Sequence, residues 1–113
     1  MGRRQEKNQG ITEVKIRILD SASQDLMDGA SFYELQERGL GEYFLDSLFA
    51  DIDSLSLYAG IHAIFFHNYH RSLAKRFPFA VYYKIDGDTV LVYAVLDCRR
   101  NPAWTRKRIA GKQ

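Results

Sequence analysis

The sequence predicts an α+β fold in which a small antiparallel sheet packs on one face against an N-terminal helical hairpin. Three observations predict it. A short segment near the start alternates apolar and basic residues, the following stretch repeats apolar residues at helical spacing around a glycine-containing break, and the second half is rich in aromatic and β-branched residues around a hairpin turn. The predicted element order is β-α-α-β-β-β.

The chain has 113 residues, which suits one small domain, because two domains would each bury too little core. Residues 1–10 are polar and predict a disordered tail, which leaves residues 11–113 as the single domain. The tail lacks the apolar run of a secretory signal, no apolar stretch reaches the roughly 20 residues that span a bilayer, and the lone cysteine cannot form an internal disulfide. We therefore expect a cytoplasmic protein without a membrane contact.

The first half of the domain predicts one strand and two helices. Residues 14–18 alternate apolar and basic residues, as a half-buried strand does. Ser21 and Gln24 have the spacing of a capping box, which predicts that a helix begins there. Gly39 and Gly41 break this helix and permit a tight reversal. The apolar stripe of the first helix comprises Ala22, Leu26, Ala30 and Tyr33.

The second helix follows the reversal and ends at Gly60. Its apolar stripe comprises Phe44, Leu48, Ile52 and Leu55. Its acidic residues predict a solvated outer face made by Glu42, Asp46, Asp51 and Asp53. The short connection makes the two helices antiparallel neighbours.

The second half predicts a three-stranded meander. Residues 61–68 are apolar without a clean period and receive no assignment, whereas residues 69–75 and 79–85 favour strands. A turn signal, Asp-Gly-Asp, leads into residues 89–96, which are apolar on both faces and predict a central strand. Residues 99–113 predict a basic tail with at most one short helical turn.

The charges divide along the chain. Residues 11–60 carry ten acids and three bases (net −7), residues 61–113 carry ten bases and three acids (net +7), and residues 1–10 add +2, which gives the total of +2. The basic half predicts a partner that carries phosphates or an acidic protein surface. The alternative is that both halves are ordinary solvated surface.

Aromatic residues interleave with the basic residues of the second half. The basic residues are Arg71, Lys75, Arg76, Arg99, Arg100, Arg106, Lys107 and Arg108. The aromatic residues are Tyr69, Phe77, Tyr82, Tyr83, Tyr93 and Trp104. Guanidinium groups bind phosphate in a bidentate manner, aromatic faces stack on bases, and charge stabilisation alone can accelerate phosphodiester cleavage. The alternative is that most tyrosines belong to the core.

Other catalytic or metal-binding patterns are weak. His67 and His70 lie three apart on a predicted loop and strand, where their side chains point to opposite faces, so we expect no metal site and no cofactor. His70 could move a proton near a phosphate beside Arg71, or it could simply line a loop. Cys98 has neighbouring positive charge but no base close in sequence, so a half-buried strand-end cysteine is the simpler interpretation.

The segments 69–71 (YHR), 75–83 (KRFPFAVYY) and 97–102 (DCRRNP) together resemble the RelE/ParE toxin superfamily of type II toxin–antitoxin, or plasmid-stabilisation, systems. The resemblance covers roughly residues 12–108 and implies the same β-α-α-β-β-β order. It implies a cognate antitoxin as partner. It also implies one of two targets, which are DNA gyrase for ParE-like members and mRNA on the ribosome for RelE-like members.

The resemblance also implies site residues. It places Arg71 on the second strand, Arg76 at the opening of the third and Arg100 at the end of the fourth. In a metal-independent ribonuclease, these three arginines would hold the scissile phosphate. The remaining target-binding set would be Lys75, Arg99, Trp104, Arg106, Arg108, Tyr69 and His70. Cys98, or Asp97 if the register shifts by one, stands where many relatives have a histidine, which favours the gyrase target over cleavage. A third reading is a nucleic-acid-binding or protein-binding module that has lost activity. The spatial expectation is that the three arginines converge on one side of the sheet.

Overall fold

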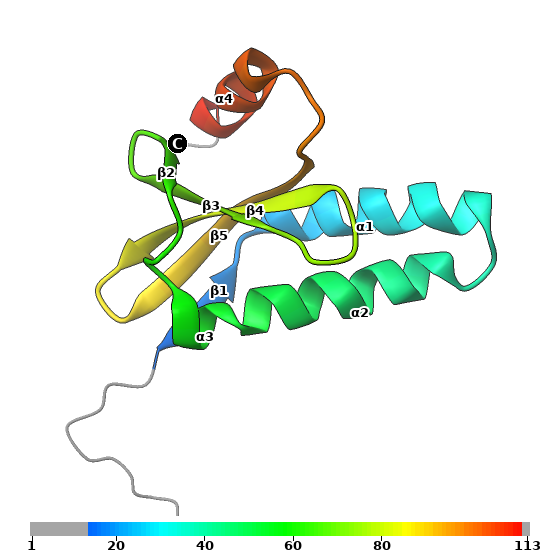
Figure 1. Ribbon diagram of the computed structural model, residues 1–113, viewed down its shortest axis with the longest axis horizontal. Helices are drawn as coiled ribbons and strands as arrows, with labels where there is room; N and C mark the ends of the chain where they lie inside the picture. Colours follow the sequence, from blue (N-terminus) through cyan, green and yellow to red (C-terminus); the bar gives the residue numbers. More distant parts are fainter. Residues whose placement is uncertain (1–13, 112–113) are drawn as a thin grey trace, which may run out of the picture.

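A computed structural model describes residues 14–111 of the chain as one sheet with helices on both faces (Figure 1). The tail predicted for residues 1–10 lies outside the described residues. The elements are β1 (Lys15–Ile18), α1 (Asp20–Gln36), α2 (Leu40–Asp53), α3 (Leu55–Tyr58), β2 (Ile64–Phe66), β3 (Tyr69–Leu73), β4 (Phe79–Asp86), β5 (Thr89–Asp97) and α4 (Pro102–Ala110). None of the helices within residues 14–111 is long and apolar enough to cross a membrane.

The five strands form one sheet in the order β1-β5-β4-β3-β2. The α+β class is confirmed, but the sheet is mixed and not wholly antiparallel, because β1 pairs with β5 in parallel. Parallel neighbours need a long connection, and the intervening helices and meander supply it here. As predicted, β5 lies inside the sheet, between β1 and β4.

Two apolar clusters cover the two faces of the sheet. Val81 and Tyr83 of β4 face α1 and α2, where the larger cluster also contains Leu26, Phe44 and Leu48. Ala80 and Tyr82 alternate with them and face the opposite side, where Ile109 of α4 joins a smaller cluster. Because both faces are covered, five of the eight residues of β4 and five of the nine residues of β5 are buried.

A β-bulge interrupts the pairing of β4 with β5. Tyr82 lies opposite Ala94 whereas Tyr83 lies opposite Val92, which leaves Tyr93 as the extra residue. As a result, both Tyr93 and Ala94 contribute to the α4 side of the sheet.

The start of α1 differs from the prediction. The helix is capped by Leu19, and no side chain makes a cap hydrogen bond, so the capping box predicted at Ser21 and Gln24 is wrong. The Ser21 hydroxyl instead donates to the Tyr93 carbonyl oxygen at 2.7 Å. The Ser21 side chain therefore attaches α1 to the bulge of β5 and does not cap the N-terminus of its own helix.

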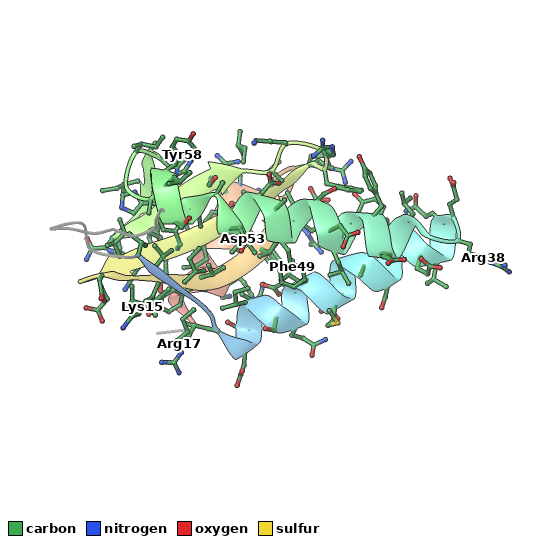
Figure 2. All side chains as sticks on the ribbon, turned by 90° about the horizontal axis from the view of Figure 1, so that it is seen from below. Lys15, Arg17, Arg38, Phe49, Asp53 and Tyr58 are labelled. Carbon is green, nitrogen blue, oxygen red and sulfur yellow. The ribbon has the colours of Figure 1, made fainter. Side chains whose placement is uncertain are left out.

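The predicted helical hairpin is confirmed, and its turn uses Gly39 at a φ of 89°, a left-handed conformation that glycine adopts without strain. Figure 2 shows α1 and α2 side by side in front of the sheet, with Arg38 at the far turn and with Phe49 and Asp53 on α2. One detail is wrong: Asp51, predicted on the solvated outer face, is buried and accepts the backbone N–H of Lys75 at 3.1 Å.

The remaining differences lie in the second half. The unassigned segment contains β2 and a turn in which His67 has a φ of 52°. Strand β3 ends at Leu73, so Arg76 lies in the connection before β4 and does not open that strand. The predicted short turn near the end is the nine-residue helix α4, whose N-terminus is capped by the Asn101 side chain.

The hairpin turn depends on a close approach at Gly41. A Cβ atom there would lie 2.6 Å from the Ala30 carbonyl oxygen and 3.0 Å from the Glu34 Cβ. Gly41→Ala should therefore lower the free energy of unfolding by about 1–3 kcal/mol, despite the better helix propensity of alanine. Urea denaturation measures the change. Gly111→Ala is the matched control, because the same methyl meets nothing closer than 3.5 Å. Equal midpoints for the two variants would contradict the close approach.

Candidate functional site

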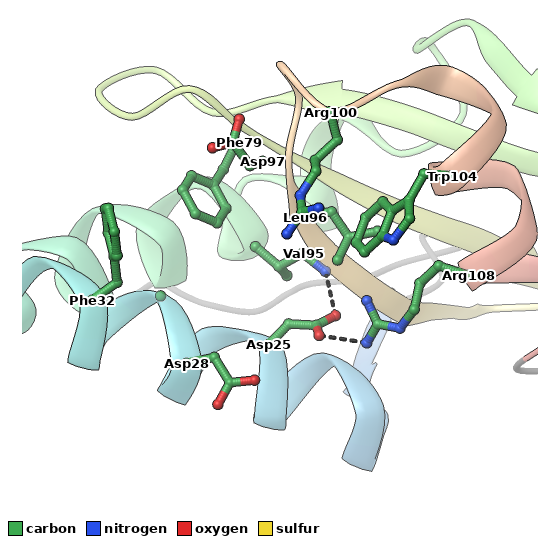
Figure 3. A pocket seen from close by; sticks show the side chains of 11 residues that line it. Asp25, Asp28, Phe32, Phe79, Val95, Leu96, Asp97, Arg100, Trp104 and Arg108 are labelled. Carbon is green, nitrogen blue, oxygen red and sulfur yellow. Dashed lines mark hydrogen bonds and ion pairs between the residues drawn. The ribbon is translucent and has the colours of Figure 1, made fainter.

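An open cavity of about 440 Å³ lies between α1 and the end of β5 (Figure 3). Its lining comes from three parts of the chain that are distant in sequence: Asp25, Asp28, Gly29, Phe32, Phe79, Val95, Leu96, Asp97, Arg100, Trp104 and Arg108. Three of the predicted site residues, Arg100, Trp104 and Arg108, meet here.

Arg100 and Trp104 form one unit within the cavity. The Arg100 guanidinium carbon lies 4.3 Å from the centroid of the Trp104 ring, which is a cation–π contact. This contact does not occupy the N–H donors of the guanidinium as an ion pair would. Arg100 is exposed and makes no ion pair with any residue in 14–111.

Asp25 anchors the inner wall of the cavity. One carboxylate oxygen accepts the backbone N–H of Val95 at 3.0 Å, and the other accepts a guanidinium N–H of Arg108 at 2.5 Å (Figure 3). Sequence reasoning missed Asp25, although its place on the apolar stripe between Ala22 and Leu26 was an available signal. Arg108, predicted to bind the target, is in large part committed to this pair.

Arg99 is committed to a neighbour as well. Its side chain donates to both carboxylate oxygens of Asp97, at 2.9 and 2.6 Å. These hydrogen bonds lower the pKa of Asp97 below its ordinary value, against the opposing effect of burial. Because the pair is exposed, it is easily exchanged for contacts with a partner.

Arg71 lies elsewhere, on the α4 side of β3. Its guanidinium carbon is 5.4 Å from the Phe65 ring centroid, and the residue lies opposite Tyr82 of β4. Burial raises the pKa of Tyr82, and the positive charge of Arg71 partly offsets that rise. The Nε atom of Arg71 is buried without a hydrogen-bond partner in the described part of the chain.

Tyr69 and Lys84 lie on the same face of the sheet as Arg71. Tyr69 is fully buried, and its hydroxyl also lacks a hydrogen-bond partner within residues 14–111. The Lys84 ammonium lies 4.5 Å from the Tyr69 ring centroid and 5.5 Å from that of Tyr93. The sequence analysis did not identify Lys84 as a site residue, because it is counted only among the ten bases of residues 61–113.

His70 points to the opposite face from Arg71, because neighbouring strand residues alternate. Its ring stacks on Tyr83, and its Nδ1 lies 2.9 Å from the His62 carbonyl oxygen, so Nδ1 carries the proton and donates it. His70 and Arg71 therefore lie on opposite faces of the sheet and cannot both contact one phosphate, contrary to the expectation from their neighbouring positions.

His62 belongs to a network that the sequence did not reveal. Its Nδ1 lies 2.6 Å from the Tyr83 hydroxyl, which also accepts the Gly60 N–H, and its Nε2 lies 3.3 Å from the Ser72 hydroxyl. Burial first, and the charge of His70 second, lower the pKa of His62. The network joins the segment after α3 to β3 and β4.

The remaining predicted residues are dispersed. Lys75 and Arg76 are exposed in the connection between β3 and β4, and Arg106 is exposed on α4. Cys98 is half-buried and free. The cavity at Arg100 is lined by neither Arg71 nor Arg76. Within residues 14–111, no group of three or more metal-ligating side chains gathers.

The fold is similar to that of a solved chain described as "Chromosomal ParDE TA system from P. aeruginosa". The TM-score is 0.63 at 13% identity, and the match covers 74% of this chain and 94% of that chain. The chain therefore has a RelE/ParE-type fold, which confirms the resemblance at the level of the fold. No family model matches the sequence, and no curated protein matches it.

Arg108→Ala should destabilise the attachment of α4, because it removes one partner of a buried carboxylate. We expect a loss of about 1–3 kcal/mol in the free energy of unfolding, measured by urea denaturation. Arg106→Ala is the control, since it removes the same charge from an exposed position of the same helix. Equal losses in the two variants would argue against a stabilising role of the pair with Asp25.

His62 should make the protein less stable as the pH falls. Its folded pKa lies below the ordinary value of about 6.5, so the unfolded chain binds the proton first, and stability is lost as the pH drops from about 6.5 through the folded pKa. His62→Gln should flatten the dependence of the urea midpoint on pH between about 7 and 5. His67→Asn, at an exposed turn position that asparagine tolerates, should keep the wild-type slope. An unchanged slope in His62→Gln would refute this assignment.

Proposed function

We propose that the protein is the toxin of a type II toxin–antitoxin pair and that it stops growth in the cytoplasm by binding DNA gyrase. The observation that carries the proposal is the RelE/ParE-type fold, shared with a chain of a ParDE system over 94% of that chain. The name of that system pairs a toxin with an antitoxin, which supports a cognate antitoxin as the first partner of this chain.

The placement of the arginines supports binding over cleavage. A ribonuclease that relies on charge stabilisation needs its cations around one phosphate. Here Arg71 lies on the α4 side of β3, Arg76 in the exposed connection before β4, and Arg100 in the cavity beside α1. By the resemblance, Cys98, or Asp97 in the shifted register, stands where many relatives have a histidine, so that candidate proton donor is missing.

An inhibitor that acts by binding needs only an exposed surface of suitable charge. Arg99 and Arg100 directly follow β5 and are exposed, and the Arg100 guanidinium contacts Trp104 of α4. These residues give this end of β5 a cationic surface that includes Trp104 as an aromatic contact. Such a surface suits an acidic partner protein.

A specific observation favours messenger RNA as the second candidate target. On the α4 side of the sheet, the Arg71 Nε and the Tyr69 hydroxyl are buried donors without a partner in the described residues, and Lys84 adds a second cation. Unused donors next to positive charge suit a phosphate group. In that case Arg71 would hold the phosphate, and Lys84 would stabilise the developing charge.

Induced expression of the wild-type protein should arrest growth, and co-expression of a short neighbouring open reading frame should restore it. Arg100→Ala should relieve the arrest while the protein stays folded, because it removes the exposed cation that is stacked on Trp104. Colony counts after induction measure the effect, which we expect to exceed roughly tenfold. Arg38→Ala is the control, since it removes an arginine at the far turn of the hairpin (Figure 2).

Two assays then separate the targets. A gyrase supercoiling assay should be inhibited by wild-type protein and not by Arg100→Ala, whereas toeprinting on translating ribosomes should show no new cleavage. Cleavage that is lost in Arg71→Ala would instead establish the ribonuclease. Unimpeded growth at high soluble expression would reject the toxin and leave an inactive binding module.

A further inference from the structure

We propose that the cavity between α1 and α4 is a docking groove for a peptide segment of a partner protein. The segment would insert an apolar side chain between Phe32, Phe79 and Trp104 and present a neighbouring carboxylate to Arg100 (Figure 3). The proposal does not depend on which target the protein inhibits, or on its being toxic.

The apolar part of the groove has a buried floor and two exposed aromatic walls. Phe79, Val95 and Leu96 form a buried floor, while Phe32 and Trp104 stand on opposite walls at 55% and 39% exposure. Large aromatic side chains around a concavity are the usual anchoring points for a partner residue. The volume of about 440 Å³ is sufficient for a leucine or phenylalanine side chain with its flanking backbone.

The charges decide the chemistry of the segment. Of the cations around the groove, Arg108 is paired with Asp25 and Arg99 with Asp97, so Arg100 is the one whose donors remain available. Its contact with Trp104 restrains the guanidinium beside the groove, which lowers the entropy cost of binding a carboxylate. Arg100 therefore selects a single acidic group next to the apolar anchor.

The same charges exclude a nucleic-acid strand from the groove. Its lining holds three aspartates, Asp25, Asp28 and Asp97, against two arginines, Arg100 and Arg108. A backbone with a phosphate at every step would meet these carboxylates. Asp28 on the α1 wall also sets the direction of the peptide, because it repels a carboxylate there and leaves the Arg100 end as the acidic one.

Trp104 makes the proposal directly testable, because it is the protein's only tryptophan and lies in the groove. The probe is a capped eight-residue peptide in which one leucine or phenylalanine is followed by a single glutamate among neutral polar residues, titrated into the full-length protein while tryptophan emission is recorded. The comparison probe has glutamine in place of the glutamate. We expect saturable binding of the acidic peptide with a shift of the emission maximum, and binding at least roughly tenfold weaker for the glutamine peptide.

Two matched pairs of variants locate the binding. Arg100→Gln should weaken binding of the acidic peptide roughly tenfold, whereas Lys107→Gln, which removes one charge from an exposed position of α4, should leave it nearly unchanged. Phe32→Ser should weaken both peptides, whereas Phe49→Ser, at an exposed aromatic of α2 outside the groove, should weaken neither. Circular dichroism establishes that each variant is folded.

Several results would overturn the docking groove. They are equal affinity for the two peptides, equal loss in Arg100→Gln and Lys107→Gln, binding by anisotropy of a labelled peptide without any change at Trp104, or no binding of either peptide. Growth arrest is measured separately, so a protein that fails to arrest growth but binds the acidic peptide would refute the proposed toxin and support the groove.

Discussion

The fold depends on how α1 completes the unpaired edge of β5. Strand β1 stops at Ile18, opposite Val92, although β5 continues to Asp97. Beyond that point the backbone of β5 would bury hydrogen-bonding groups without a strand to pair with, which is costly. The Ser21 hydroxyl donates to the Tyr93 carbonyl oxygen, and the Asp25 carboxylate accepts the Val95 N–H.

These two side chains lie four residues apart on α1, so one face of the helix presents both to β5. The helix thereby takes the place of a longer first strand, and its angle to the sheet is fixed by polar contacts as well as by packing. Asp25 carries this further, because its second oxygen holds Arg108 of α4. One buried carboxylate thus connects a helix on one face of the sheet to a helix associated with the other face.

The sequence predicted what depends on local pattern. The apolar stripe through Leu26 and the stripe through Phe44 identified both helices of the hairpin, and the turn signal at Gly87 identified the β4–β5 hairpin. Predictions failed where a side chain has a distant partner. Ser21 matches a capping box locally, but its bond goes to Tyr93, 72 residues away.

The candidate site shows the same division. The basic and aromatic composition identified Arg100 and Trp104, which do meet in space. It could not reveal that Arg108 is occupied by Asp25, 83 residues distant, or that His70 and Arg71 diverge across the sheet. The parallel pairing of β1 was also hidden, because residues 14–18 have the same alternating pattern in either orientation. The charges divide between the two halves of the sequence, whereas the ion pair of Asp25 with Arg108, the most buried one within residues 14–111, joins the two halves.

The parallel β1–β5 pair has a consequence for the order in which the molecule is made. Lys15 pairs opposite Thr89, so the first strand finds its only neighbour in the sheet after most of the chain has been synthesised. Contacts this distant in sequence slow folding, because the intervening loop must close before they form. During translation, the residues of the helical hairpin and of β2 to β4 are all synthesised before β1 can pair with β5. The surface shared by α1, β5 and α4 therefore cannot form until residues 89–110 have been synthesised, long after the helical hairpin has left the ribosome.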